Sequence, residues 1–76
     1  MDAYILVQTE VGKAAQVARE VARIKGVLSA EDVTGPYDVI VRAEARTLDD
    51  LSRQVLIKIQ QVEGITRTIT CSVVHL

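Results

Sequence analysis

Apolar residues recur along the chain with two different periods. Over residues 3–9 they occur at odd-numbered and at even-numbered positions, for example at Ile5 and Leu6. Because these positions face opposite sides of a strand, the pattern favours a strand buried on both faces. Over residues 13–24 they instead fall three or four positions apart, which favours a helix with one apolar side. The positions of this helical stripe are Ala14, Val17, Ala18, Val21 and Ile24.

The second half of the chain repeats this order of patterns. An alternating segment is again followed by a helical pattern, over residues 47–63. Thr47 is suited to cap the helix start, and Asp50 stands three residues further on, where a capping box places an acidic residue. The inward stripe consists of Leu48, Leu51, Val55, Ile59 and Val62. Leu56 and Ile57 fall outside this stripe, and we assign them to a subunit contact.

The two helices are expected to end in the same way. Ile24-Lys25-Gly26-Val27 recurs as Val62-Glu63-Gly64-Ile65, and the two copies are separated by half of the 76-residue chain. In each copy the glycine suits the left-handed conformation in which many helices end. The chain therefore consists of two strand-helix-strand halves.

These patterns define a fold class. The expected strands cover residues 3–9, 27–34, 39–45 and 65–76, and the expected helices cover residues 13–24 and 47–63. Right-handed crossovers place both helices on one face of an antiparallel four-stranded sheet. With strand order 4-1-3-2, this is the α+β, ferredoxin-like βαββαβ sandwich. The other sheet face is left uncovered, and we expect it to carry apolar and threonine side chains.

The size of the chain adds a reason to expect assembly. With 76 residues, the default is one domain spanning residues 1–76, and a domain this small buries only about 60% of its unfolded surface. One cysteine allows no internal disulfide, while 49% of the residues are hydrophobic. We therefore expect a homo-oligomer that dimerises through the uncovered sheet face.

Charge and composition exclude several partners. The formal net charge is −1, with nine basic and ten acidic residues and no run of like charge, so direct nucleic-acid binding is not expected. No apolar stretch approaches the roughly 20 residues that span a membrane. The first residues lack the features of a signal peptide, and a single cysteine suits a reducing compartment, so we expect a cytoplasmic protein.

Few residues in this chain could perform catalysis. The one histidine, His75, is expected at the surface near a strand end, and Cys71 is expected as a small buried hydrophobic residue. The acidic pairs Glu31-Asp32 and Asp49-Asp50 fit solvated charge better than an acid/base pair. No phosphate-binding glycine loop and no cluster of metal ligands is present. We therefore expect a protein that is not an enzyme and that holds no cofactor or metal.

The stretch Thr34-Gly35-Pro36-Tyr37-Asp38 contains the only proline of the chain. One interpretation is a hairpin turn in which Asp38 hydrogen-bonds to local backbone. The other is a site for a small zwitterion, in which turn N–H groups face a carboxylate, Asp38 faces an ammonium and Tyr37 forms a wall. Such a site needs a second wall, which a neighbouring subunit could provide.

This stretch also carries a resemblance to a known family. Residues 34–41, Thr-Gly-Pro-Tyr-Asp-Val-Ile-Val, resemble the TG-x-Y/F-D turn and strand of the Lrp/AsnC effector-binding domain, also called the RAM domain. Residues 62–70 are similar to the family's stretch leading into the last strand, and Lys25-Gly26-Val27 fits its first helix exit. The similarity covers essentially the whole chain, with these patterns in the family's order.

The resemblance implies an αβ-sandwich that dimerises through its sheet and forms a ring of dimers such as an octamer or decamer. It implies an amino-acid effector bound between dimers. The implied ligand-binding residues are Gly35, Pro36, Tyr37, Asp38, Thr68 and Thr70. Full-length family members carry an N-terminal helix-turn-helix domain, whereas this sequence starts at the first strand. We therefore expect a stand-alone form that modulates transcription indirectly, with full-length Lrp/AsnC regulators as further partners.

Two alternatives from other functional classes stay open at this point. The chain could be a purely structural oligomerisation module that binds no ligand, or a small ferredoxin-like dimeric enzyme. The enzyme alternative needs an acid/base group in a cleft, and the sequence offers no convincing candidate. An ACT-type regulatory domain has the same topology and would act by a similar mechanism.

Overall fold

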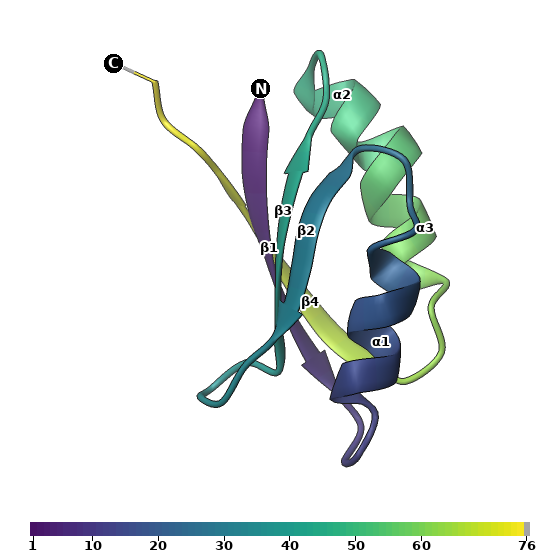
Figure 1. Cartoon of the computed structure of the whole chain (residues 1–76). Coiled ribbons are helices and arrows are strands. Elements are labelled where there is room, and N and C mark those ends of the chain that lie inside the picture. Colours follow the sequence, from purple (N-terminus) through teal and green to yellow (C-terminus); the bar gives the residue numbers. More distant parts are fainter. Residues whose placement is uncertain (76) are drawn as a thin grey trace.

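The computed structural model describes residues 1–75. The strands are β1 (Asp2–Thr9), β2 (Val27–Asp32), β3 (Val39–Glu44) and β4 (Ile65–Ser72). They form one antiparallel sheet in the order β2-β3-β1-β4, which confirms the predicted order. Both helical segments lie on the same side of this sheet (Figure 1). The expected last strand, residues 65–76, ends earlier at Ser72, and position 76 lies outside the described residues.

The first helix, α1 (Ala14–Val21), is shorter than the predicted span of residues 13–24. The second helical segment consists of α2 (Leu48–Leu51), the π-helical turn η1 (Ser52–Leu56) and α3 (Ile57–Gln60). At its start the Asp50 N–H donates to Thr47 Oγ1 at 3.1 Å, which confirms the predicted cap. The Ile57 N–H donates to the Ser52 carbonyl five residues back, and this bond widens the turn.

The wider turn explains one wrong assignment. Leu56, which we assigned to a subunit contact, packs against the core instead, because the extra residue in the turn brings it round towards the sheet beside Val55. Leu48 was also assigned wrongly, to the inward stripe. It is 57% exposed, because it is the first residue of α2 and lies before the part of the segment that packs on the sheet.

The core lies between the sheet and the helices. Its members alternate along β1 and β3 and fall on the inward sides of the helices, and each is at most 5% exposed. They are Ala3, Ile5, Val7, Val17, Ala18, Val21, Val39, Val41, Ala43, Leu51, Val55 and Ile59. Full burial of one Val, Leu or Ile side chain contributes about 1.5–3 kcal/mol, so this layer is the main source of stability.

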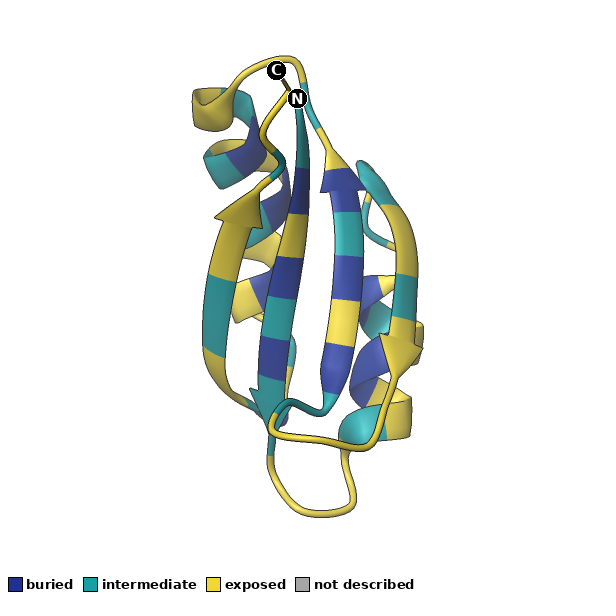
Figure 2. Ribbon diagram, turned by 90° about the vertical axis from the view of Figure 1, so that its left-hand side faces the viewer, coloured by how far each residue is buried: buried dark blue, intermediate teal, exposed yellow. Residues whose placement is uncertain are grey.

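The opposite face of the sheet has no helix on it. Figure 2 shows the sheet from this side, with buried and more exposed residues alternating along β1 and β3. Leu6 on β1 is paired with Ile40 on β3, and Tyr4 with Arg42. We call this surface the uncovered face. It carries apolar residues, as expected, together with charged ones such as Arg42 and Glu31.

The register of β4 corrects two further expectations. Thr68 is paired with Val7 and Thr70 with Ile5, and since paired residues point to the same side, both threonines lie on the helix side. Ile69 and Cys71 face outwards instead. Cys71 is exposed and not buried as expected, because β4 is an edge strand and this side of it carries no helix.

Each helix-exit glycine contacts the other half of the chain. Gly26 and Gly64 both have φ of +98°, a conformation that favours glycine. A Cβ on Gly26 would lie 2.8 Å from Val55 Cγ2, and a Cβ on Gly64 would lie 3.3 Å from Val17 Cγ2. Their carbonyls accept hydrogen bonds of 2.8 Å from Glu44 and Glu10, respectively. The two halves therefore interlock through reciprocal contacts.

Candidate functional site

The candidate site is built on the hairpin loop between β2 and β3, residues 33–38. The Val33 N–H donates to the Asp38 carbonyl at 2.9 Å and closes the loop. Gly35 has φ of +147°, which residues with a side chain rarely adopt. This glycine is therefore needed for the shape of the loop and not only for its flexibility.

The loop folds back over the uncovered face and encloses a hollow. Gln8 Nε2 on β1 donates to the Pro36 carbonyl at 3.1 Å and ties the loop to the sheet. The hollow has a volume of about 400 Å³, within the usual range for small-molecule sites. It is lined by Leu6, Val33, Thr34, Gly35, Pro36, Tyr37 and Ile40. We call it the loop hollow.

Asp38 fixes the loop to the end of β1. Its Oδ2 accepts a 2.7 Å hydrogen bond from the Thr9 N–H, and its own N–H donates to the Val7 carbonyl at 2.9 Å. The expectation that Asp38 bonds the local turn backbone is therefore wrong in its partner, because the neighbouring strand supplies the donor. A carboxylate has about four lone-pair sites, so this contact leaves Asp38 able to accept a ligand donor as well.

Three N–H groups of the loop have no protein partner. Within residues 1–75, the backbone N–H groups of Thr34, Gly35 and Tyr37 donate to no protein acceptor. Such donors can bind a carboxylate, as the zwitterion interpretation requires. The N–H of Asp38 cannot serve this purpose, because it is part of the sheet.

One chain does not bring all six predicted site residues together. Gly35, Pro36 and Tyr37 line the loop hollow, with Asp38 next to them. Thr68 and Thr70 lie on the helix side of β4, while β3, which follows the loop, lies on the other side of β1. Two strand spacings are about 10 Å, so the threonines and the loop could share a ligand only if a second chain were involved.

Thr68 belongs to a different hollow. This second hollow has a volume of about 250 Å³ and is also lined by Gln60, Ile65, Thr66 and Arg67. A third, of about 400 Å³, lies at the other end of the sheet and is lined by Met1, Lys25, Gly26, Glu44, Ala45, Arg46 and Gln54. Both differ from the loop hollow in having charged side chains in their walls.

Sequence reasoning missed the floor of the loop hollow and its tie to the sheet. Leu6 and Ile40 form the floor, and Gln8 provides the tie. Leu6 and Ile40 belong to two different expected strands, residues 3–9 and 39–45. That they lie side by side depends on the strand register, which the pattern alone does not give.

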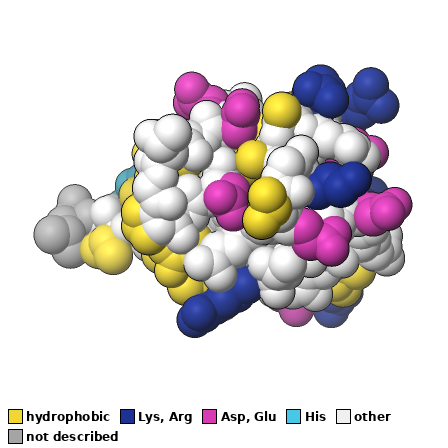
Figure 3. Space-filling model, turned by 90° about the horizontal axis from the view of Figure 1, so that it is seen from below, with side chains coloured by type: hydrophobic (Ala, Val, Ile, Leu, Met, Phe, Trp, Pro, Cys, Tyr) yellow, Lys and Arg dark blue, Asp and Glu magenta, His cyan; other side chains and the backbone are white. Residues whose placement is uncertain are grey.

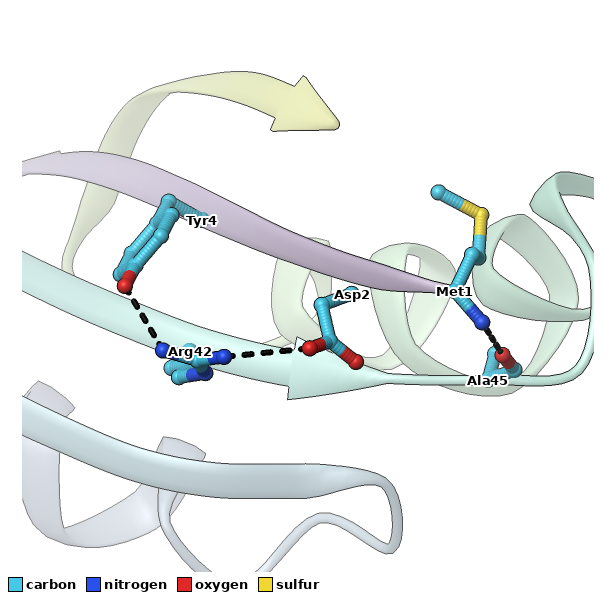
Figure 4. A network of polar contacts seen from close by, with 5 residues as sticks. All are labelled: Met1, Asp2, Tyr4, Arg42 and Ala45. Atoms are coloured by element: carbon cyan, nitrogen blue, oxygen red, sulfur yellow. Dashed lines mark hydrogen bonds and ion pairs between the residues drawn. The ribbon is translucent and has the colours of Figure 1, made fainter. Parts of the chain in front are cut away.

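A polar network occupies the other end of the uncovered face (Figure 4). Arg42 donates to Tyr4 Oη at 2.8 Å and to Asp2 Oδ2 at 3.1 Å, and its guanidinium lies 5.3 Å from the centre of the Tyr4 ring. The hydrogen bond to Asp2, followed by the interaction with Tyr4, raises the pKa of Arg42. Arg42 therefore places a fixed positive charge at one end of the uncovered face, on the same side of the sheet as Leu6 and Ile40.

The end of the molecule from which the hairpin loop projects has a mixed surface. Figure 3 shows acidic and basic side chains interspersed there, with hydrophobic side chains between them. Residues 1–75 hold no group of three or more His, Cys, Asp or Glu side chains that could bind a metal ion. In the same residues, no helix is long and apolar enough to cross a membrane.

Comparison with known proteins places this geometry in context. Residues 2–75 match the family model of the Lrp/AsnC ligand binding domain. An uncharacterized HTH-type transcriptional regulator of Pyrococcus furiosus is 36% identical over 70 residues, which are 92% of this chain and 47% of that protein. Homocitrate synthase of Sulfolobus acidocaldarius is 33% identical over 54 residues, 71% of this chain but 11% of the enzyme.

Solved structures agree with this similarity. A hypothetical protein from Pyrococcus horikoshii has a TM-score of 0.85 and 33% identity, covering 97% of this chain and 90% of its own. The AsnC protein of E. coli has a TM-score of 0.87 over 99% of this chain and 51% of its own, and at 21% identity it supports the fold alone. This chain spans 37–47% of the length of its HTH-type relatives. It belongs to the Lrp/AsnC ligand-binding domain family.

Proposed function

We propose that residues 1–76 act as one module that binds an amino-acid effector and assembles into a homo-oligomer. The observation that carries this proposal is the loop hollow, in which a family turn stretch folds over the uncovered face and leaves three N–H groups without a protein partner. A module of this kind affects transcription indirectly, through its own assembly or by co-assembly with full-length Lrp/AsnC regulators. It performs no catalysis and works in the cytoplasm.

The polar groups of the loop suit a zwitterion. The N–H groups of Gly35 and Tyr37 bind the carboxylate of the effector, and the carboxylate of Asp38 binds its ammonium group. Asp38 is held in place by the Thr9 N–H, so it is positioned before a ligand arrives. Preorganised groups of this kind reduce the entropic cost of binding.

The loop hollow is open, and assembly would close it. In this proposal a second chain packs on the uncovered face, forming a dimer, and dimers associate into a ring such as an octamer or decamer. Thr68 and Thr70 lie on the helix side of β4, so in this proposal they reach the effector from a subunit of a neighbouring dimer in the ring. The partly exposed Tyr4, at 38%, supports a partner on this face outside the loop hollow, because burying it would be favourable.

The relatives support sensing over catalysis. The same segment matches proteins named as HTH-type transcriptional regulators and an enzyme named homocitrate synthase. A role that the regulators and the enzyme have in common must reside in the segment that they share with this chain. Ligand sensing and assembly meet this requirement, whereas DNA binding or the synthase reaction does not.

Isothermal titration calorimetry with each of the twenty amino acids tests the proposal, with light scattering to follow the oligomer. At least one amino acid is expected to bind with a Kd below 1 mM. The matched variant is Asp38→Asn, which keeps an oxygen acceptor for the Thr9 N–H but removes the charge that faces the ammonium. It should weaken binding about tenfold or more and leave assembly unchanged.

The same experiment addresses the structural alternative. If the protein assembles but no amino acid binds, a role as an oligomerisation module without ligand replaces the proposal. If an amino acid binds equally well to Asp38→Asn and to the natural chain, the site is not at this loop. A protein that stays monomeric at all concentrations contradicts the assembly part.

A further inference from the structure

The loop hollow differs from the other hollows described above in the chemistry of its walls. Leu6 and Ile40 form its floor, and Val33, Pro36 and Tyr37 form most of its sides. The seven residues that line it include no charged side chain, and Thr34 and Tyr37 supply its only side-chain polar groups. The other two hollows contain Arg67 in one case and Lys25, Glu44 and Arg46 in the other.

The polar groups available to a ligand lie along the loop and not on the floor. The N–H groups of Gly35 and Tyr37 belong to the loop backbone, and Asp38 lies where the loop joins β3. The Pro36 carbonyl is already bonded to Gln8. A bound amino acid would therefore hold its ammonium and carboxylate against the loop and direct its side chain towards Leu6 and Ile40.

A side chain in this position meets an apolar surface. A charged ligand side chain would lose part of its hydration and find no opposite charge among the lining residues, which is unfavourable. An aliphatic or aromatic side chain would instead bury apolar area together with Leu6 and Ile40. The volume of about 400 Å³ has room for a side chain of either kind.

We infer that the effector is an amino acid with an uncharged, apolar side chain, aliphatic or aromatic, which packs on Leu6 and Ile40. This inference rests on the proposed function and narrows its ligand class. The competing occupant of the loop hollow is an apolar side chain from a second copy of this chain, and the experiments below separate the two.

The first experiment compares amino acids by calorimetry on the natural chain. Leucine, methionine and phenylalanine represent the apolar class, and lysine, arginine and glutamate represent the charged class. At least one member of the apolar class should bind ten times more tightly than every charged one. Preferred binding of a charged amino acid would overturn the inference and leave the proposed function intact, whereas binding of none would remove the proposed function itself.

The second experiment assigns the contact to the floor of the loop hollow. Ile40→Ala should weaken binding of the preferred apolar amino acid at least fivefold. The matched control is Ile69→Ala, which removes the same side chain from the same face at a position paired with Leu6 but outside the hollow. It should leave affinity within twofold, and Val33→Ala, at the side wall, should reproduce the Ile40→Ala effect.

Light scattering on each variant distinguishes ligand contact from assembly. If Ile40→Ala and Ile69→Ala weaken binding equally, the effect passes through the oligomer and the inference fails. If Ile40→Ala reduces assembly and leaves affinity unchanged, a second copy occupies the hollow and the inference also fails. A selective loss of affinity in Ile40→Ala and Val33→Ala, with the oligomer preserved, supports it.

Discussion

On β1, Ile5 points towards the helices and is fully buried, whereas its neighbour Leu6 points away from them and is only partly buried. The same contrast holds on β3 between Val41, which is fully buried, and Ile40, which is 37% exposed. Residues of one chemical type, one position apart, therefore have different partners. The helix side serves folding, whereas our proposal assigns the uncovered face to a ligand and a second chain.

The comparison teaches that the core uses the apolar residues of only one side of the sheet, and our proposal gives those of the other side a second task. A domain of this size cannot cover all of its apolar surface with its own helices. The sheet is therefore buried on one side by the chain itself. Substitutions at adjacent positions should then separate the two tasks, and the largest effect is expected on the helix side.

Replacing Ile5 by alanine should destabilise the folded chain, because it removes a side chain from the helix side of the sheet. Because Ile5 is fully buried, the variant should lower the free energy of unfolding by about 2–5 kcal/mol. Urea denaturation at one fixed protein concentration measures this change. The matched Leu6→Ala variant should cost less, and equal losses from the two variants would contradict the contrast between the faces.

Placing a charge on the uncovered face should weaken assembly and leave the fold intact. Leu6→Asp introduces a carboxylate beside Ile40, where a second chain would have to desolvate it. The association constant of the oligomer should fall at least tenfold, as measured by analytical ultracentrifugation, while the far-UV circular dichroism of the chain is retained. Gln16→Asp, on the exposed side of α1, is the control and should assemble like the natural chain.

Disrupting the polar network on the uncovered face should have the smallest effect on stability. Arg42 and Asp2 remain partly exposed, at 41% and 25% of their side-chain areas, so Arg42→Gln should barely change the urea midpoint. The raised pKa of Arg42 stabilises the folded chain at every pH below the ordinary guanidinium value and is lost only above it. The small difference in stability between Arg42→Gln and the natural chain should therefore be the same from pH 6 to pH 9, and a difference that changes with pH in this range would contradict the assignment.

The sequence predicts the features of the fold that depend on period. The alternation of β3, the inward stripe of α1 and both glycine exits follow from local spacing, and the structure confirms them. The expected burial of β1 on both faces is wrong, because no helix covers the side of Tyr4 and Leu6. Strand register and the extra residue of η1 are set by packing between distant segments. For this reason the sequence pattern alone could not predict which side of its strand or helix each of four residues faces. These residues are Leu56, Thr68, Thr70 and Cys71.

The candidate site was predicted in part. The turn residues Gly35 to Tyr37 were identified by their composition, and they do line a hollow. The floor of that hollow comes from two strands, and its closure depends on the hydrogen bond from Gln8 to Pro36. A contact between residues 28 positions apart leaves no trace in a local pattern.

The reciprocal glycine contacts have a consequence for how the chain unfolds. Gly26 packs against Val55, and Gly64 against Val17, so neither strand-helix-strand half has a complete surface of its own. Loss of one half therefore exposes the core of the other, and the chain should lose its structure in a single cooperative transition. Local opening should then be confined to segments outside the core, such as the hairpin loop between β2 and β3.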